Sequence, residues 1–212
     1  MEKSSLETTL ILVRHGETAF NQEGRYQGQQ DIPLNDVGRA QAQDVKARLA
    51  QESYQFLWSS DLSRAKETAE IIRGDSPITL HIDPRFREIS FGHWEGHSSQ
   101  VIAEQWPAEV KQWREQPQIA RIPGGETLRE VHQRLQDGLK SIVEHHQGEK
   151  GVLVLHGGPI HVLGLDFIHR YRIPIDNGGI SVIKKQVDQW VLRSVNDVAH
   201  LSQKGTINNY EV

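Results

Sequence analysis

The stretch Thr8-Thr-Leu-Ile-Leu-Val13 runs directly into Arg14-His15-Gly16. Its first six residues are apolar or favour extended backbone, and they predict a short buried strand. A positive charge, an imidazole and a glycine are costly to place at the mouth of a buried strand unless they are used. The sequence therefore predicts a strand that ends at a functional turn.

A second predicted strand ends in the same way. Gly151-Val-Leu-Val-Leu155 is the clearest buried strand pattern in the chain, and it runs into His156-Gly157-Gly158. In open α/β sheets, ligands bind beyond the carboxyl ends of the strands, and the N–H groups that open a helix there favour an anion. Two histidines at such ends are expected to face one pocket, although His156 taken alone also fits a structural, hydrogen-bonded histidine.

Strand and helix patterns alternate along the rest of the chain. Helices are predicted over residues 35–50 and 62–72 and from a capping box at Thr127–Glu130 to about His146, and further strands over 54–58, 180–185 and 190–195. This alternation predicts an α/β fold with three layers, α/β/α, in which helices cover both faces of a mostly parallel central sheet.

We expect a single domain over residues 1–212, with a small helical cap insertion at about residues 98–121. Trp106 and Trp113 are seven residues apart in this insertion, which predicts that both lie on one inward-facing side of a helix. Specificity for a substrate is expected to reside in this cap and in the loops around it.

The composition excludes several classes of protein. There are no cysteines, which excludes a disulfide framework, a thiol nucleophile and cysteine-bound zinc. A formal net charge of -4 argues against nucleic acid and anionic membranes as partners, because the summed field repels phosphate polymers. Neither a signal peptide nor a run of membrane-spanning length is visible. We expect a cytoplasmic protein, although the lack of cysteine suits an exported one equally well, and base rates favour a homodimer.

Four separated motifs, in the expected order, resemble those of the histidine phosphatase superfamily, which includes cofactor-dependent phosphoglycerate mutases and many small phosphatases. The motifs are Leu12-Val-Arg-His-Gly-Glu-Thr18 with Asn21 and Arg25-Tyr-Gln-Gly28, Ser59-Ser-Asp-Leu-Ser-Arg-Ala65, Arg87-Glu-Ile89 with Phe91-Gly-His-Trp-Glu-Gly96, and Leu155-His-Gly-Gly158. The chain departs from the family at Leu155, where serine or threonine is common. A hydrogen bond that would hold His156 is therefore expected to be missing.

The resemblance implies a role for each matching residue. His15 would attack phosphorus to give a phosphohistidine, while Arg14, Arg64 and His156 would surround the phosphoryl oxygens. Glu88 would protonate the leaving alcohol and then activate water. Neutral donors would come from Asn21, Gln27 and the backbone N–H of Gly157. Fixed cations can stabilise the transferring phosphoryl group, so the resemblance implies neither a metal nor a cofactor.

Some residues keep open alternatives. Taken without its neighbours, Glu88 is better explained by an ion pair with Arg85 or Arg87. Arg121 could reach a carboxylate or a second phosphate of the substrate if its loop folds over the pocket. His93 and His97 flank the third motif and could touch substrate, but a metal site there would need a third ligand that the sequence does not identify.

Three functions fit the resemblance. The favoured one is a phosphatase acting on a small phosphorylated metabolite: a sugar phosphate, phosphoglycerate, phosphoserine or riboside phosphate. The second is a mutase that depends on a bisphosphorylated primer, and the third is a silent relative that only binds phospho-ligands. About thirty residues separate Glu88 from Arg121, which is too few for the long insertion that phosphoglycerate mutases share after the third motif. Silent members usually lose a site residue, whereas all five catalytic candidates are present here.

Overall fold

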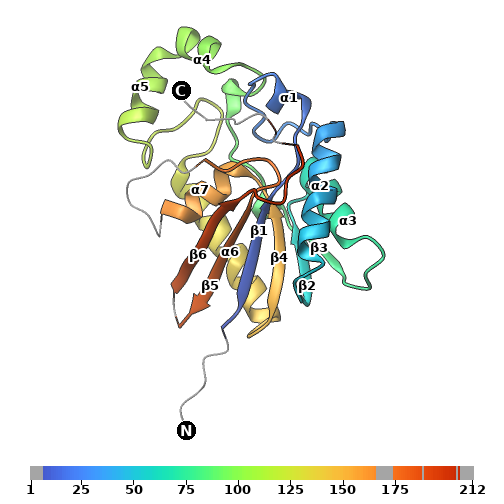
Figure 1. Ribbon diagram of the computed structural model, residues 1–212. Coiled ribbons are helices and arrows are strands. Elements are labelled where there is room, and N and C mark those ends of the chain that lie inside the picture. Colours follow the sequence, from blue (N-terminus) through green and yellow to red (C-terminus); the bar gives the residue numbers. More distant parts are fainter. Residues whose placement is uncertain (1–6, 166–173, 188, 204, 206–212) are drawn as a thin grey trace.

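The computed structural model describes residues 7–165, 174–187, 189–203 and 205. Six strands in these ranges form one sheet in the order β3-β2-β4-β1-β5-β6 (Figure 1). The strands are β1 (Thr9–Arg14), β2 (Phe56–Ser59), β3 (Leu80–Ile82), β4 (Lys150–Leu155), β5 (Ile180–Gln186) and β6 (Gln189–Asp197).

The first four strands of the chain run parallel, and the last two run antiparallel to their neighbours. β4 pairs in parallel with both β1 and β2, and β2 with β3. β5 is antiparallel to β1 and to β6. The chain has only two residues between the end of β5 at Gln186 and the start of β6 at Gln189, too few for the long crossover that a parallel pair requires. The predicted mostly parallel sheet is confirmed, with an antiparallel hairpin at one edge.

Helices lie on both faces of the sheet (Figure 1). They are α1 (Ala19–Gln22), α2 (Asp36–Leu49), α3 (Ser63–Arg73), α4 (Ser99–Gln105), α5 (Pro107–Glu115), α6 (Leu128–His145) and α7 (Gly157–Leu165). Alternate side chains of β1 enter two separate cores: Leu10 and Leu12 share one with α6 and α7, and Ile11 and Val13 share the other with α2 and α3. This confirms the three-layer α/β/α fold. None of the helices in the described ranges combines the length and apolar character needed to cross a bilayer.

Helix α6 begins at the predicted capping box. The Glu130 N–H donates to the Thr127 hydroxyl at 3.2 Å, and the Glu130 carboxylate accepts from the Thr127 N–H at 2.8 Å. Val131, Leu135 and Leu139 then form one fully buried stripe against the sheet. This spacing fixes the rotation of α6 about its axis and therefore decides which side chains it presents to the loops beside it.

The segment predicted to form a cap contains α4 and α5, which lie beyond the end of the sheet where β1 stops (Figure 1). The prediction that Trp106 and Trp113 share one helical face was wrong. Trp106 has φ -129° and ψ 55°, because the following Pro107 disfavours helical backbone and starts a new helix. Both tryptophans nevertheless pack, partly buried, against the core that α6 covers.

Candidate active site

The two histidines meet because β1 and β4 are in parallel register. Arg14 lies opposite Leu155, and the N–H of His15 donates to the Leu155 carbonyl at 3.0 Å. The residue that follows each strand is a histidine, and both histidines therefore lie at the same edge of the sheet. The rings of His15 and His156 are 5.0 Å apart between centroids, and both side chains are buried.

The ring of His15 is held with one nitrogen available for attack. Its Nδ1 lies 2.7 Å from the Gly16 carbonyl oxygen. Because a carbonyl only accepts, Nδ1 carries the proton and Nε2 keeps its lone pair. Burial, together with the charges of Arg64 and Arg14, holds the pKa of His15 well below its ordinary value of 6.5. His15 is therefore neutral near pH 7, as a nitrogen nucleophile must be.

Arg64 lies against that nitrogen. Its Nε donates to His15 Nε2 at 3.3 Å, while its terminal nitrogens donate to the carbonyls of Gln30 at 2.9 Å and Gly28 at 2.8 Å. The two carbonyls belong to the loop after the first motif and fix the plane of the guanidinium. A buried cation is thus oriented beside the position that a phosphoryl group bound to Nε2 would occupy.

Several other buried donors near His15 have no acceptor within the described ranges. They are Arg14 Nε and Nη2 and Asn21 Nδ2, and the ring nitrogen Nδ1 of His156 also has no partner there. A buried donor left without an acceptor costs about 1–3 kcal/mol, so such groups seldom gather without a ligand. Arg14 is anchored through its remaining nitrogen, which donates to the Ile175 carbonyl. The surplus of donors and of positive charge suits an anion such as phosphate.

Asn177 is a site residue that the sequence interpretation did not identify. Its Nδ2 donates to the carbonyl of His15 at 3.0 Å and to Oδ1 of Asn21 at 3.2 Å. The Asp-Asn-Gly-Gly stretch signalled only a turn, and nothing local shows that this amide reaches the end of β1. Gln27 joins the same group through its Oε1, which accepts from the Thr18 hydroxyl at 2.7 Å.

Glu88 is a buried carboxyl at the edge of this group. Its Oε1 accepts from the N–H of Ile89 at 2.8 Å, and its Oε2 accepts from the N–H of Gly158, in the first turn of α7, at 3.3 Å. Burial raises the pKa of Glu88, although these two hydrogen bonds and the charges of Arg64 and Arg14 oppose the shift. The carboxyl therefore holds its proton to higher pH than an exposed glutamate, as a general acid requires.

The two arginines offered as alternative partners of Glu88 are engaged elsewhere. Arg85 forms an ion pair with Asp83, and Arg87 forms one with Asp61 at 2.6 Å. Arg121 forms an exposed ion pair with Glu130 at the start of α6.

Ser60 compensates for the departure at Leu155. Its hydroxyl lies 2.9 Å from His156 Nε2, whereas Leu155 is fully buried in the apolar core. His156 therefore has a hydrogen-bond partner in Ser60, the residue that follows β2, rather than in the residue that precedes it in β4. If the Ser60 hydroxyl donates, the proton of His156 resides on Nδ1, where it can serve an anion. Ser60 was visible in the second motif, but the direction of its side chain was not.

The helix α7 begins at Gly157, so its first N–H groups lie at the end of β4 beside His156. Among the residues described, no group of three or more histidine or carboxylate side chains is arranged to hold a metal ion. His93 is exposed, and the His97 ring lies 5.6 Å from that of Trp106 in the cap segment.

Comparison with known families agrees with this geometry. The model of the histidine phosphatase superfamily (branch 1) matches residues 10–198. The chain belongs to the histidine phosphatase superfamily. The match covers all four motifs, so the predicted family membership is confirmed. Members of this superfamily are phosphatases or mutases.

Relatives of both kinds are similar to this chain over nearly its whole length. A protein of Salmonella choleraesuis named "Probable phosphoglycerate mutase GpmB" is 38% identical, with 91% of this chain and 94% of the relative covered. The solved structure of Bacillus stearothermophilus YhfR is 35% identical, with 92% and 99% of the two chains covered and a TM-score of 0.82. An alpha-ribazole phosphatase from Shigella flexneri is 28% identical, with 89% and 96% covered and a TM-score of 0.79.

Proposed function

We propose that this protein is a phosphatase that hydrolyses small phosphomonoesters, without a metal ion, through a phosphohistidine formed on His15. The observation that carries the proposal is the state of His15: a neutral, buried imidazole whose Nε2 accepts a hydrogen bond from Arg64, next to the buried Arg14, whose Nε and Nη2 have no acceptor in the described ranges. Such an arrangement suits attack on phosphorus and stabilisation of the charge that develops on the phosphoryl oxygens.

The first step transfers the phosphoryl group to the enzyme. The lone pair of His15 Nε2 forms a bond to phosphorus while the bond between phosphorus and the ester oxygen breaks. Arg14, Arg64 and His156 stabilise the phosphoryl oxygens, with the N–H groups of Asn21, Gln27 and Gly157 as neutral donors. The leaving oxygen takes the proton of the Glu88 carboxyl, whose raised pKa lets it hold that proton to higher pH than an exposed glutamate does.

The second step returns the enzyme to its starting state. The Glu88 carboxylate, now ionised, accepts a proton from a water molecule as that water attacks phosphorus. The bond between phosphorus and Nε2 breaks, its electron pair returns to the imidazole, and inorganic phosphate leaves. The proton balance closes because Glu88 loses one proton in the first step and regains one in the second.

The test is phosphate release from a panel of sugar phosphates, phosphoglycerate, phosphoserine and riboside phosphates, measured with EDTA present. Release that persists in EDTA and disappears in His15→Ala supports the proposal, because the variant lacks the nucleophile. His15→Ala is expected to remain folded, which its thermal unfolding checks. A His15→Ala variant that keeps wild-type turnover would remove His15 from the mechanism.

Phosphoglycerate mutase is the second candidate, and the name of the 38% identical relative favours it. A mutase returns the phosphoryl group to a second hydroxyl, so it needs a bisphosphorylated primer and must keep water from the phosphohistidine. Interconversion of phosphoglycerates that depends on added bisphosphoglycerate, with little release of phosphate, would replace the phosphatase proposal. Failure in both assays would leave a protein that only binds phospho-ligands.

A further inference from the structure

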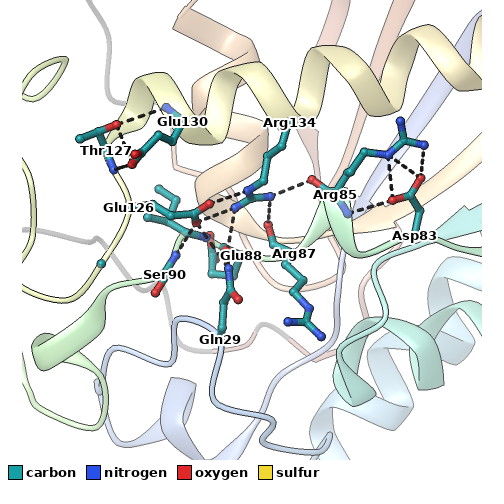
Figure 2. A network of polar contacts seen from close by, with 12 residues as sticks. Gln29, Asp83, Arg85, Arg87, Glu88, Ser90, Glu126, Thr127, Glu130 and Arg134 are labelled. Atoms are coloured by element: carbon teal, nitrogen blue, oxygen red, sulfur yellow. Dashed lines mark hydrogen bonds and ion pairs between the residues drawn. The ribbon is translucent and has the colours of Figure 1, made fainter.

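Arg134 reaches from α6 to the segment that carries Glu88 (Figure 2). Its Nη1 donates to the carbonyls of Arg85 at 2.8 Å and Arg87 at 2.7 Å. Its Nη2 donates to the carbonyl of Glu88 and to a Glu126 oxygen, both at 2.9 Å, and its Nε donates to the other Glu126 oxygen at 2.8 Å. A guanidinium has five N–H donors in a rigid plane, so every donor of Arg134 has an acceptor.

Glu126 extends this grip to the other side of Glu88. Its Oε2 accepts from the N–H of Ser90 at 2.8 Å, and its own N–H donates to the Ser90 carbonyl at 2.9 Å. Gln29 adds a further donor, 3.2 Å from the Glu88 carbonyl (Figure 2). One ion pair, only 17% and 22% exposed in its two side chains, thus contacts the backbone both before and after the proposed general acid.

The Glu88 segment needs such contacts because it is not paired with a strand through main-chain hydrogen bonds. It lies between two short 3₁₀ turns, Pro84–Phe86 and Gly92–Trp94. The Glu88 carboxyl accepts from the N–H of the next residue, so its orientation follows the backbone of the segment. A displacement of these carbonyls would therefore move the carboxyl relative to the leaving oxygen.

We propose that the Arg134–Glu126 ion pair is a positioning device that sets the place from which Glu88 delivers its proton. This inference rests on the proposed role of Glu88 as the general acid. Arg134 does not itself reach the reacting atoms and is a positioning residue. The competing explanation is that the pair only stabilises the fold, and the two explanations predict different kinetics.

Arg134→Lys separates geometry from charge. Lysine keeps the positive charge but has three donors on a single nitrogen, so it cannot serve three carbonyls and a carboxylate in one plane. We expect kcat/KM for an alkyl phosphate to fall about 10²-fold, the usual consequence of displacing a catalytic group by about 1 Å. With p-nitrophenyl phosphate the loss should be only a few-fold, because that leaving group needs little help from a proton.

The experiment measures kcat/KM for both esters in the wild type, Arg134→Lys, Glu88→Gln and the double variant. Since kcat/KM reports the steps up to cleavage of the ester bond, the ratio of the two esters measures the contribution of the acid. In the Glu88→Gln background, Arg134→Lys should cost less than about 2-fold on either ester, because the group that it positions is already gone.

Arg85→Lys is the matched control. The Arg85 side chain ties the 3₁₀ turn before the Glu88 segment to the same helix through the Asp137 carbonyl and the Ser141 hydroxyl, and it pairs with Asp83. Arg85→Lys should lower thermal stability without changing the ratio of kcat/KM between the two esters. Thermal unfolding of each variant detects loss of the fold, and if Arg134→Lys does not fold, Glu126→Gln, which keeps the shape of its side chain, replaces it.

Equal losses on both esters, or losses that add fully to those of Glu88→Gln, would overturn the positioning role and leave a structural one. An unchanged Arg134→Lys would overturn it as well. In each of these cases, a selective loss in Glu88→Gln would leave the proposed function intact. If Glu88→Gln itself loses equally on both esters, or if no ester is turned over, the general-acid role fails and the inference fails with it.

Discussion

The two sides of the candidate site are held in place by different means. The strand-end side, His15 and His156, is placed by the parallel ladder of β1 and β4, in which main-chain hydrogen bonds alone fix the register. The loop side, Glu88, lies in a segment without a ladder, whose carbonyls are satisfied by the Arg134 side chain. Regular secondary structure therefore positions the two histidines, whereas the proposed proton donor depends on a few long side chains.

The largest effect expected in testing this contrast is that of Glu88→Gln. It should lower kcat/KM for alkyl phosphates about 10²–10⁴-fold, the usual contribution of a positioned acid. In the wild type, kcat/KM should fall as pH rises past the raised pKa of Glu88, and this limb should vanish in the variant. A limb that persists in the variant belongs to another group, and Glu88 would then not be the acid.

Alanine substitutions at two glycines, Gly16 and Gly158, test how rigid the two sides of the site are. A Cβ on Gly16 would lie 2.2 Å from the Gly38 carbonyl oxygen, which is backbone at the start of α2, whereas a Cβ on Gly158 would lie 2.2 Å from Oε1 of Glu88, which is a side chain. Gly16→Ala should therefore lower the free energy of unfolding by about 3 kcal/mol, the upper part of the usual range for overpacking. Gly158→Ala should cost less stability, because the atoms nearest to its Cβ, Oε1 of Glu88 and Cδ1 of Ile89 at 2.8 Å, belong to side chains. It should lower alkyl phosphate turnover by about 10²-fold, since Glu88 must move.

Urea unfolding and kcat/KM of the two glycine variants make this comparison. Equal losses of stability would mean that the Glu88 segment is as rigid as the strand ends. Retention of full activity in Gly158→Ala would mean that the carboxyl can be displaced without consequence, which contradicts the positioning argument.

A smaller effect is expected from Ser60→Ala, which removes the hydroxyl 2.9 Å from His156 Nε2. One hydrogen bond contributes about 1 kcal/mol, so turnover should fall about 5- to 10-fold. Nitrogen NMR of His156 should also show loss of the preference for a proton on Nδ1. Ser59→Ala is the control, because the Ser59 hydroxyl donates to the Ser60 carbonyl instead. An unchanged tautomer in Ser60→Ala would assign the orientation of His156 to its burial alone.

The pH dependence of stability should differ in sign between the two sides of the site. The pKa values of His15 and His156 are lowered in the folded state, chiefly by burial, so below about pH 6.5 the unfolded chain binds protons that the folded chain does not. Each of these histidines then makes stability fall by up to about 1.4 kcal/mol per pH unit as pH decreases.

Glu88 acts in the opposite direction. Because its pKa is raised, the folded chain holds a proton that the unfolded chain releases above about pH 4.5, so its contribution declines as pH rises through the raised pKa. Urea unfolding across pH 4.5–7.5 measures how the free energy of unfolding changes with pH. As pH decreases, this free energy should fall less steeply in His15→Ala than in the wild type, and more steeply in Glu88→Gln. Matching slopes in both variants and the wild type would remove these groups as the source.

Local pattern predicted most of the elements and the ends of the strands that matter. The apolar run before Arg14, the run before His156 and the capping box at Thr127 each depend on neighbours within a few residues, so they are readable directly. The break at Pro107 was equally local, and the prediction of one helical face for Trp106 and Trp113 gave it too little weight. The antiparallel direction of β5 was not predicted, because it depends on which strand of the sheet still has an unpaired edge, and no local sequence pattern shows this.

The sequence by itself determined the family, the strand ends that carry His15 and His156, and the identity of the proposed acid. The strand ends follow from periodicity and turn residues, which are properties of short stretches of chain, whereas the family and the proposed acid follow from the resemblance of four motifs to those of a known family. Only the tertiary structure decided that Ser60 holds His156, that Asn177 reaches the His15 carbonyl and that Arg134 grips the Glu88 segment. Each of these contacts joins residues at least 46 positions apart, because a buried polar group must find its partner in space, and no local pattern records where that partner lies.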